Sequence, residues 1–338
     1  MVDSPTRPAP AATGSARTDA TVEARPGGAS RASGEVREMS KRPNPLERAV
    51  NVWRYRELLV NLTRKELKVK YKNSVLGFVW TLLNPALYLV VFSLVFQVVL
   101  QVKIPYYGIF FLAGLLGWNF FATAVSAGTT SIVGNSQLVS KVWFPREILP
   151  LASIGAAIFH FLLQLTVLAA ALILFRRAPS LHYLPALVPA LVVLLLFASA
   201  LAIALAAVNV YLRDTQHLLE LVLLAWFWMT PVAYPYQLVA DRLGPAREWW
   251  AAANPILTVV VTFQQALYNP SRPAFMWLSN GPRDPSNVVR DQVTPALPEH
   301  PLTWYLTRLG SSALVGASLL LGALWLFGRL EDNMAEEI

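Results

Sequence analysis

Residues 56–80 read RELLVNLTRKELKVKYKNSVLGFVW, and they join a strongly charged segment to an apolar one. On a helix that turns about 100° per residue, an apolar face forms from Tyr55, Leu58, Leu59, Leu62 and Val69. Polar residues share a flank: Arg54, Asn61, Arg64, Lys65, Lys68 and Lys72. The pattern predicts an amphipathic helix at a membrane surface, with its cations near anionic lipid. We expect this surface to be cytoplasmic, because Lys and Arg accumulate on that side.

Apolar stretches dominate the rest of the chain. Hydrophobic residues fill 55% of the 338 positions, and six stretches approach or exceed the ~20 apolar residues that cross a hydrocarbon core. The predicted spans cover residues 76–100, 108–127, 148–175, 184–211, 218–232 and 304–327. All should be helices, because a backbone in lipid must satisfy its own polar groups. The expected fold class is therefore an all-α integral membrane protein with six transmembrane helices.

The segment before the last predicted span is unusual. Residues 249–261 turn apolar for only a short run, too short for a comfortable span and too apolar for an exposed loop. Pro231 and Pro235 would break the fifth span near its outer end, and Asn254-Pro255 would begin the returning piece. These signals predict re-entrant outer half-helices.

The positive charge is concentrated near the first span. The chain carries a formal net charge of +8, and residues 1–72 hold 15 Lys and Arg against 8 Asp and Glu. Cations beside a span favour a topology signal over a nucleic-acid surface. We therefore expect no nucleic-acid partner, contact with membrane lipids, and both termini in the cytoplasm.

Several chemistries find no support in the sequence. The chain has no cysteine, which excludes thiolate metal sites and cysteine nucleophiles. No Lys follows a Gly, so no Gly-Lys-Ser/Thr phosphate loop exists. The four histidines are scattered, and Glu220 alone among the acids lies close to a predicted span. Ion-coupled transport needs ionisable groups inside the membrane, so we expect no energy source in this chain. Without these motifs or converging histidines, we also expect no enzyme activity and no metal site.

Composition predicts four regions. Residues 1–46, rich in Ala, Pro, Ser, Gly and Arg, are expected to be a disordered cytoplasmic tail without a cleavable signal peptide. The interface helix covers 47–74, the transmembrane domain 75–330 and a cytoplasmic C-terminus 331–338. Residues 269–302 read as an irregular outer loop.

Three polar or aromatic stretches remain as candidates for function. On the inner loop, Trp143 and Phe144 either anchor at the interface or help dock a soluble partner. Arg213-Asp214 forms a second inner corner, or only a solvated turn. The aromatics near the outer face either belong to the membrane interface or line a passage for sugars; they are Trp226, Trp228, Tyr234, Tyr236, Trp249 and Trp250.

Together these stretches resemble the ABC-2 type permeases, and among them the polysaccharide exporters for O-antigen, teichoic acid and galactan. Residues 68–80, KVKYKNSVLGFVW, followed by Leu83-Asn84-Pro85, look like the family's interface helix, Leu-Gly loop and first span. Residues 138–150, LVSKVWFPREILP, look like its coupling region. Arg213-Asp214, residues 229–232 (MTPV) and Asn254-Pro255 are similar to its later half. The resemblance covers about residues 50–330.

The resemblance implies a homodimer in the bacterial plasma (inner) membrane that binds two copies of a cytoplasmic ABC ATPase, which carries ATP and Mg²⁺. It implies ATPase docking by Gln137, Leu138, Lys141, Trp143, Phe144, Pro145, Arg146, Glu147, Arg213 and Asp214. It places a cytoplasmic entrance for a lipid-linked glycan at Ser74, Leu76, Gly77 and Trp80. It places the outer gate and aromatic lining at Trp226, Trp228, Pro231, Tyr234, Tyr236, Asn254 and Pro255.

Two other functions remain as alternatives. A related permease for a drug or lipid would share the six spans, but would not need the basic helix and Leu-Gly loop before the first span. A membrane-embedded transferase acting on lipid-linked sugars would need paired carboxylates or an Asp-x-Asp site near the membrane surface, and the sequence offers none.

Overall fold

The computed structural model describes residues 45–72, 79–101, 104–268, 297–298, 300–331 and 334–337. The chain divides into two units, residues 1–42 and 43–338, and the fold described is that of the second. Every element within the described ranges is helical, and the bounds are as follows: α2 (Pro45–Arg54), α3 (Arg56–Tyr71), α4 (Val79–Ser93), η1 (Leu94–Val99), α5 (Tyr107–Gly134), α6 (Ser136–Lys141), α7 (Ile148–Leu174), η2 (Leu184–Ala186), α8 (Leu187–Tyr211), α9 (Thr215–Met229), α10 (Tyr236–Leu243), η3 (Gly244–Ala246), α11 (Arg247–Ala253), α12 (Pro255–Phe263), η4 (Gln264–Tyr268), α13 (Leu302–Leu330) and α14 (Met334–Glu337).

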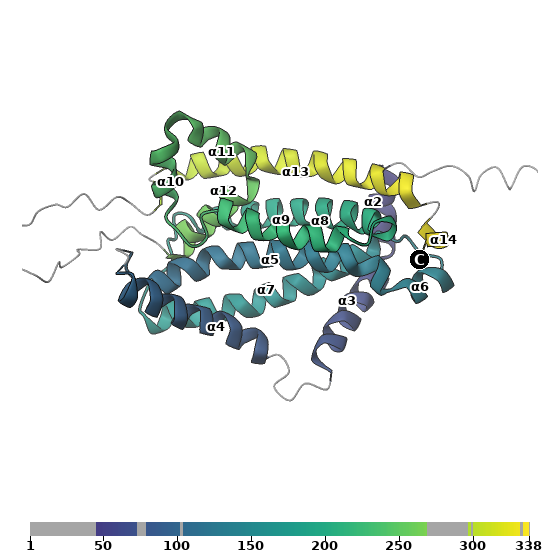
Figure 1. The fold of residues 1–338 in the computed structure, drawn as a ribbon, viewed down its shortest axis with the longest axis horizontal. Helices are drawn as coiled ribbons and strands as arrows, with labels where there is room; N and C mark the ends of the chain where they lie inside the picture. Colours follow the sequence, from purple (N-terminus) through teal and green to yellow (C-terminus); the bar gives the residue numbers. More distant parts are fainter. Residues whose placement is uncertain are drawn as a thin grey trace, which may run out of the picture. The chain divides into compact units, whose positions relative to one another are not determined.

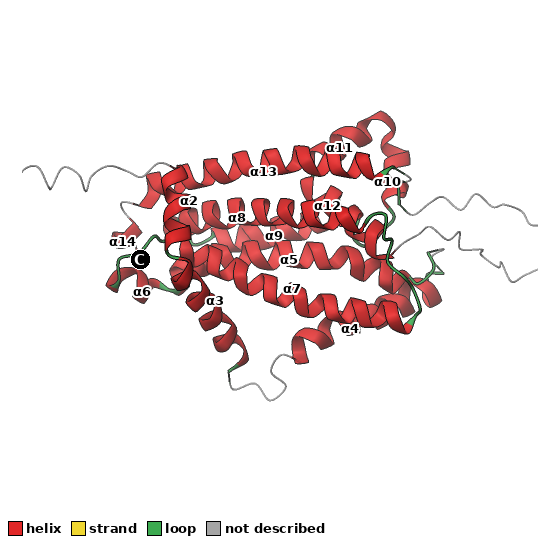
Figure 2. Cartoon of the chain, turned by 180° about the vertical axis from the view of Figure 1, so that it is seen from behind, coloured by secondary structure: helices red, strands yellow, loops and turns green. Residues whose placement is uncertain are grey.

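Five segments in this part are long and apolar enough to cross a membrane. They are Val79–Val99, Tyr107–Gly134, Ile148–Leu174, Leu184–Tyr211 and Leu302–Leu330, close to five of the six predicted spans. The long helices run alongside one another (Figures 1 and 2). Mostly buried α5 packs against α7 and α8, and α13 packs along α8. The first span, by contrast, is exposed along most of its length.

Small residues permit this close packing. A Cβ on Gly128 of α5 would lie 2.5 Å from the Cβ of Ala202 on α8. A Cβ on Gly155 of α7 would lie 2.7 Å from Thr63 Oγ1 on α3. Because side chains in lipid gain little from burial alone, helices in membranes associate through such close contacts.

The predicted fifth span, residues 218–232, corresponds to the shorter helix α9. Its 15 residues reach about 22 Å at 1.5 Å per residue, less than the ~30 Å of a hydrocarbon core. The helix ends at Met229, just before Pro231, as the prolines predict. It is therefore not among the five candidate spans.

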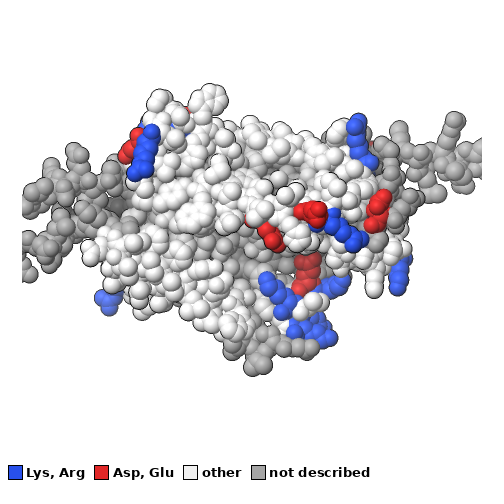
Figure 3. Space-filling view, viewed as in Figure 1, with Lys and Arg blue, Asp and Glu red and all other residues white. Residues whose placement is uncertain are grey.

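The predicted interface helix is two helices, because the chain turns at Tyr55 between α2 and α3. Leu62 is buried, and Tyr55, Leu58 and Leu59 pack beside it against one core cluster. Val69, the fifth residue of the predicted apolar face, is exposed and does not join this cluster. In the space-filling view, Lys and Arg gather over α3, whereas the broad middle of the face carries none (Figure 3).

Some predictions concern residues outside the described ranges. They include residues 1–44 of the tail, the entrance residues Ser74, Leu76 and Gly77, residues 269–296 of the outer loop, and positions 299, 332, 333 and 338.

Candidate functional site

Predicted functional residues gather at the two ends of the helical unit. The α6 end carries α6, the start of α7 and the ends of α8 and α13, and the α10 end carries α10 and α11 (Figure 1). Charged side chains predominate among the predicted residues of the first end, and aromatic rings among those of the second. The two groups of residues are therefore separate candidate sites.

The predicted docking residues divide into exposed and buried sets. Trp143 is 86% exposed, and Gln137, Lys141, Arg213 and Asp214 are also exposed. Leu138, Pro145 and Arg146 are half-buried. The interpretation of Trp143 and Phe144 as a pair of exposed aromatics is wrong for Phe144, because its ring is buried in the core cluster beneath α6. Glu147 is also buried and presents no surface of its own.

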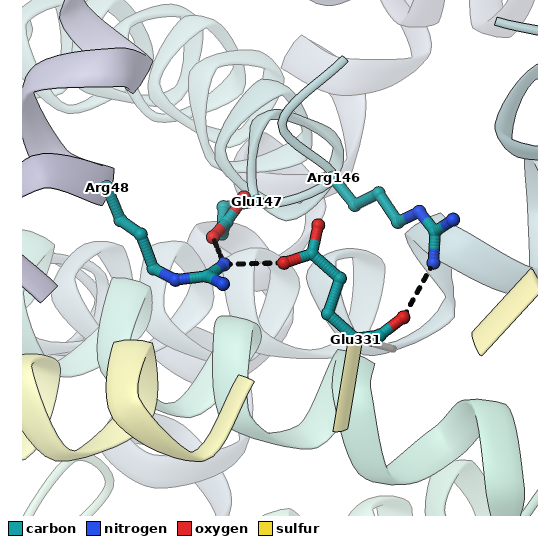
Figure 4. A network of polar contacts seen from close by, with 4 residues as sticks. All are labelled: Arg48, Arg146, Glu147 and Glu331. Carbon is teal, nitrogen blue, oxygen red and sulfur yellow. Dashed lines mark hydrogen bonds and ion pairs between the residues drawn. The ribbon is translucent and has the colours of Figure 1, made fainter. Parts of the chain in front are cut away.

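Glu147 belongs to a buried ionic network (Figure 4). Arg48 of α2 donates from Nη1 to Glu147 Oε1 and, at 2.7 Å, to Glu331 Oε2. Arg146 Nη1 donates to the main-chain oxygen of Glu331 at 3.0 Å. The network joins α2, the start of α7 and the end of α13, so it fixes the chain that leads out of α6.

The pKa of Glu147 depends on its charged neighbours in this network. Burial raises the pKa of the Glu147 carboxyl, and the neighbouring Glu331 raises it further, whereas Arg48 lowers it. A single guanidinium shared by two carboxylates compensates the burial of both only in part. Removing Arg48 would therefore leave Glu147 with a large desolvation penalty.

Helix α3 is fastened along α7. Thr63 Oγ1 donates to the oxygen of Ala152 at 3.2 Å, and Ser153 Oγ donates to Glu66 Oε1 at 2.8 Å. Lys65 Nζ donates to Asn135 Oδ1 at 2.9 Å, at the turn that begins α6. The predicted interface cations Arg64, Lys68 and Lys72 are exposed. Helix α3 is thus bonded both to α7 and to the turn that begins α6.

At the α10 end, Asn254 brings several predicted gate residues together. Its Oδ1 accepts from Trp226 Nε1 at 3.0 Å and from the Leu257 amide at 3.2 Å, which caps α12. Its Nδ2 donates to Thr230 Oγ1 at 2.9 Å. The amide is buried, so these bonds hold the end of α9 against the start of α12.

Contacts with α5 show how deep in the bundle the α9–α12 junction lies. The Trp226 ring packs against Phe121, with centroids 5.2 Å apart, and Phe121 lies 14 residues after the start of α5, or about 21 Å along a helix. The other end of the α12–η4 segment returns to the start of α5, since Tyr268 Oη donates to the Pro105 oxygen at 2.8 Å. The segment therefore runs from the middle of the bundle to its α10 end.

Gln264 fastens the connection that follows α9. Its Nε2 donates to the oxygens of Pro231 at 3.1 Å and Val232 at 3.3 Å, while its Oε1 is buried and has no partner among the described residues. Sequence reasoning missed this residue. Its signal was present, because two amides, Gln264 and Gln265, interrupt an otherwise apolar run. Arg48, also missed, gave no such signal beside the predicted tail.

The predicted aromatic lining also divides into exposed and buried residues. Trp226 is half-buried and Tyr236 is buried, stacked on Trp250 at 5.5 Å. Trp228 is exposed, and it lines a hollow of about 540 Å³ with Tyr234 and Trp250. The rings thus form a surface cavity at this end within the single chain. Among the described residues, no three His, Asp or Glu side chains converge as metal ligands would.

Comparison with known proteins identifies the family. The family described as ABC-2 type transporter matches residues 57–268, a range that includes α3 from its second residue, the α6 turn and the α9–α12 junction. The chain belongs to the ABC-2 type transporters. It is 37% identical over 218 residues to the O-antigen export system permease protein RfbA of Myxococcus xanthus, covering 64% of this chain and 82% of that protein.

A second relative carries the same description. The O-antigen export system permease protein RfbA of Klebsiella pneumoniae is 29% identical over 213 residues, covering 63% of this chain and 81% of that protein. With its five long apolar helices, this ABC-2 protein is a multi-pass membrane protein. The matches support the resemblance inferred from residues 68–85 and 138–150.

Proposed function

We propose that this chain is the permease subunit of an ATP-driven exporter that moves a lipid-linked polysaccharide, such as an O-antigen, across the bacterial plasma membrane. The observation that carries the proposal is its 37% identity to an O-antigen export permease over most of that protein's length. Two copies of this subunit form a homodimer, and neither carries a catalytic site. ATP and Mg²⁺ bind to two copies of a separate cytoplasmic ATPase.

The α9–α12 junction supports a sixth, partial crossing. Helix α9 enters from the α6 end and stops at the depth of Trp226, and α11 leads to Asn254 at that depth before α12 returns. We interpret α11 and α12 as re-entrant half-helices that form the outer gate. Buried Asn254 and Gln264 satisfy the interrupted backbone and side chains there, as membrane-buried irregular structure requires.

The α6 end supports the coupling assignment. Trp143 projects from a turn whose base is fixed by Phe144 in the core and Glu147 in the ionic network. A force on the projecting residues is thereby transmitted to α7, α13 and α2. We infer that this end is cytoplasmic, because the interface cations lie there, and that Trp143 and Lys141 contact the ATPase.

Depletion of the protein in its native cell tests the transported substrate. We expect a long lipid-linked glycan to accumulate on the cytoplasmic side while the surface polymer disappears, because the polymer's many hydroxyl groups prevent spontaneous crossing. Normal glycans together with altered drug or lipid efflux would reject polysaccharide export and favour the alternative permease.

Single-cysteine labelling tests the orientation, and the natural chain contains no cysteine that would have to be removed. Lys141→Cys should react with a membrane-impermeant maleimide only after the cells are opened. Trp249→Cys, 81% exposed at the α10 end, should react on intact cells. Labelling of both from the outside, or of neither, would contradict the proposed topology.

A further inference from the structure

A polar cavity of about 330 Å³ lies between the end of α3, the start of α4 and the middles of α5 and α7. Its volume is within the ~300–1,000 Å³ usual for small-molecule sites. Lys70 contributes its one cation, and the neutral polar side chains are Thr81, Asn84, Asn119, Thr123, His160 and Gln164. No Asp or Glu is among the described residues of the lining. The described lining therefore carries one positive charge and no negative charge.

A chain of hydrogen bonds fixes Lys70 at the wall of the cavity. Its Nζ lies 3.1 Å from His160 Nε2, and His160 Nδ1 lies 2.9 Å from the Tyr71 hydroxyl. Because an ammonium only donates, Nε2 must accept and Nδ1 must carry the proton toward Tyr71. Tyr71 then donates to Thr81 Oγ1 at 2.9 Å. Within the described part of the chain, Lys70 Nζ bonds only to His160, which leaves two of its three donors for a ligand.

Residues of α4, α5 and α7 in the lining offer more unused hydrogen-bonding capacity. Asn84, Asn119, Thr123 and Gln164 line the cavity without a hydrogen bond to any described residue. Asn84 and Thr123 are exposed, whereas Asn119 and Gln164 are half-buried. At the middle of a membrane bundle, such polar side chains are costly unless they meet water or a polar ligand. A ligand that accepts hydrogen bonds and carries negative charge would satisfy both Lys70 and these side chains.

The cavity borders the exposed face of α4. Trp80 and Asn84 line it, and the exposed Leu87 and Val91 continue the same helical face by one and two turns. A hydrocarbon chain laid along Leu87 and Val91 would thus place its polar end in the cavity. This continuity favours an amphiphile over a free ion.

We propose that the cavity binds the phosphate-bearing headgroup of a membrane lipid, with Lys70 contacting the phosphate and the hydrocarbon chain lying along α4. The proposal rests on the proposed function in one respect, since there the lipid is the carrier of the exported glycan. Binding itself requires neither the ATPase nor transport, so it is measured separately from export.

Calorimetric titration of the purified full-length protein in dodecyl maltoside tests the site with three probes: farnesyl phosphate, farnesol and inorganic phosphate. Farnesyl phosphate should bind at least tenfold more tightly than either of the others. Lys70→Gln should weaken farnesyl phosphate at least tenfold without changing farnesol, and Lys70→Arg should largely restore binding. Arg54→Gln, which removes an exposed cation preceding α3, is the matched control and should bind as the wild type does.

Three results would overturn the proposal. Equal affinity for farnesol and farnesyl phosphate would exclude a phosphate site. Inorganic phosphate binding as tightly as farnesyl phosphate would indicate a free-anion site. Unchanged binding by both Lys70→Gln on α3 and Asn84→Leu on α4 would place the ligand elsewhere. Loss of binding with normal export in cells would leave the proposed function standing, whereas normal binding without glycan export would reject the function alone.

Discussion

At the scale of single residues, a buried guanidinium joins three parts of the α6 end. Arg48 contacts Glu147 and Glu331 and is 6% exposed. Removing one partner of a buried ion pair typically costs about 3–5 kcal/mol, because the remaining charge stays desolvated. Glu331 remains after loss of Glu147, so the cost here should fall toward the lower end of that range.

Glu147→Ala should accordingly lower the Tm of the purified protein and its yield in the membrane. The measurement is thermal unfolding in detergent. Asp214→Ala, which removes an exposed carboxylate at the same end, should leave the Tm unchanged. In the Arg48→Met/Glu147→Ala double variant, the loss should be smaller than the sum of the two single losses. Equal Tm values for Glu147→Ala and Asp214→Ala would contradict the role of the network.

The charge of Lys70 should make the binding of farnesyl phosphate depend on pH. The Lys70 side chain as a whole is exposed, but partial burial of its ammonium lowers the pKa below the ordinary value of 10.5. The charge is therefore lost at a lower pH than on a fully solvated lysine. Farnesyl phosphate completes its second ionisation well below pH 8, because that pKa is near 6. Its affinity should therefore fall as pH rises through the lowered pKa of Lys70. The affinity of Lys70→Arg for farnesyl phosphate should stay constant over the same pH range. A parallel fall in the affinity of both proteins would assign the titration to another group.

At the scale of elements, the α9–α12 junction depends on one amide. Asn254→Leu removes the cap of α12 and leaves Trp226 Nε1 and Thr230 without their partner. Each unsatisfied buried group costs about 1–3 kcal/mol. We expect a lower Tm and a leak of small ions through the membrane, because α11 and α12 close the outer side in the proposed function. Asn61→Leu, at an exposed position on α3, is the control. A sealed membrane and an unchanged Tm would contradict both roles.

The exposed α6 turn leads to a separate prediction about docking of the ATPase. Trp143→Ala should weaken co-purification of the ATPase at least tenfold, because truncating an aromatic anchor in an interface costs about 2 kcal/mol or more. Its Tm should stay unchanged, because the ring is 86% exposed. Trp249→Ala, with an 81% exposed ring at the α10 end, should retain the ATPase. Equal retention by both variants would remove Trp143 from the docking surface.

The elements were predictable wherever one periodic signal dominated. Five spans and α3 follow from runs of apolar or amphipathic residues, and Pro231 correctly marks the region where α9 ends. The depth of the Trp226–Asn254 contact was not predictable, because it depends on the meeting of α9 and α12 beside α5. The burial of Glu147 was equally inaccessible, since its partner lies 99 residues earlier in the chain. Long-range pairs leave no local pattern.

At the scale of the whole molecule, the helical unit begins before the predicted interface helix. The unit starts at residue 43, and α2 brings Arg48 into the network and against Gly328 of α13. The predicted boundary at residue 46 thus falls inside α2. This shift changes how much of the N-terminus can be removed without exposing buried charge.

Two truncations separate the N-terminal unit from α2. Removal of residues 2–42 should leave the Tm, ATPase co-purification and glycan export unchanged, because Arg48, Glu147 and Glu331 all remain in the protein. Removal of residues 2–54 also deletes α2, so Glu147 is left buried without its guanidinium, a loss of about 3–5 kcal/mol. This shorter protein should unfold at a lower temperature and accumulate poorly in the membrane. Adding Glu147→Gln to it should recover part of the loss, because a neutral amide is cheaper to bury than a carboxylate. Identical behaviour of the two truncations would show that α2 does not stabilise the unit, and no recovery with Glu147→Gln would assign its contribution to packing rather than charge.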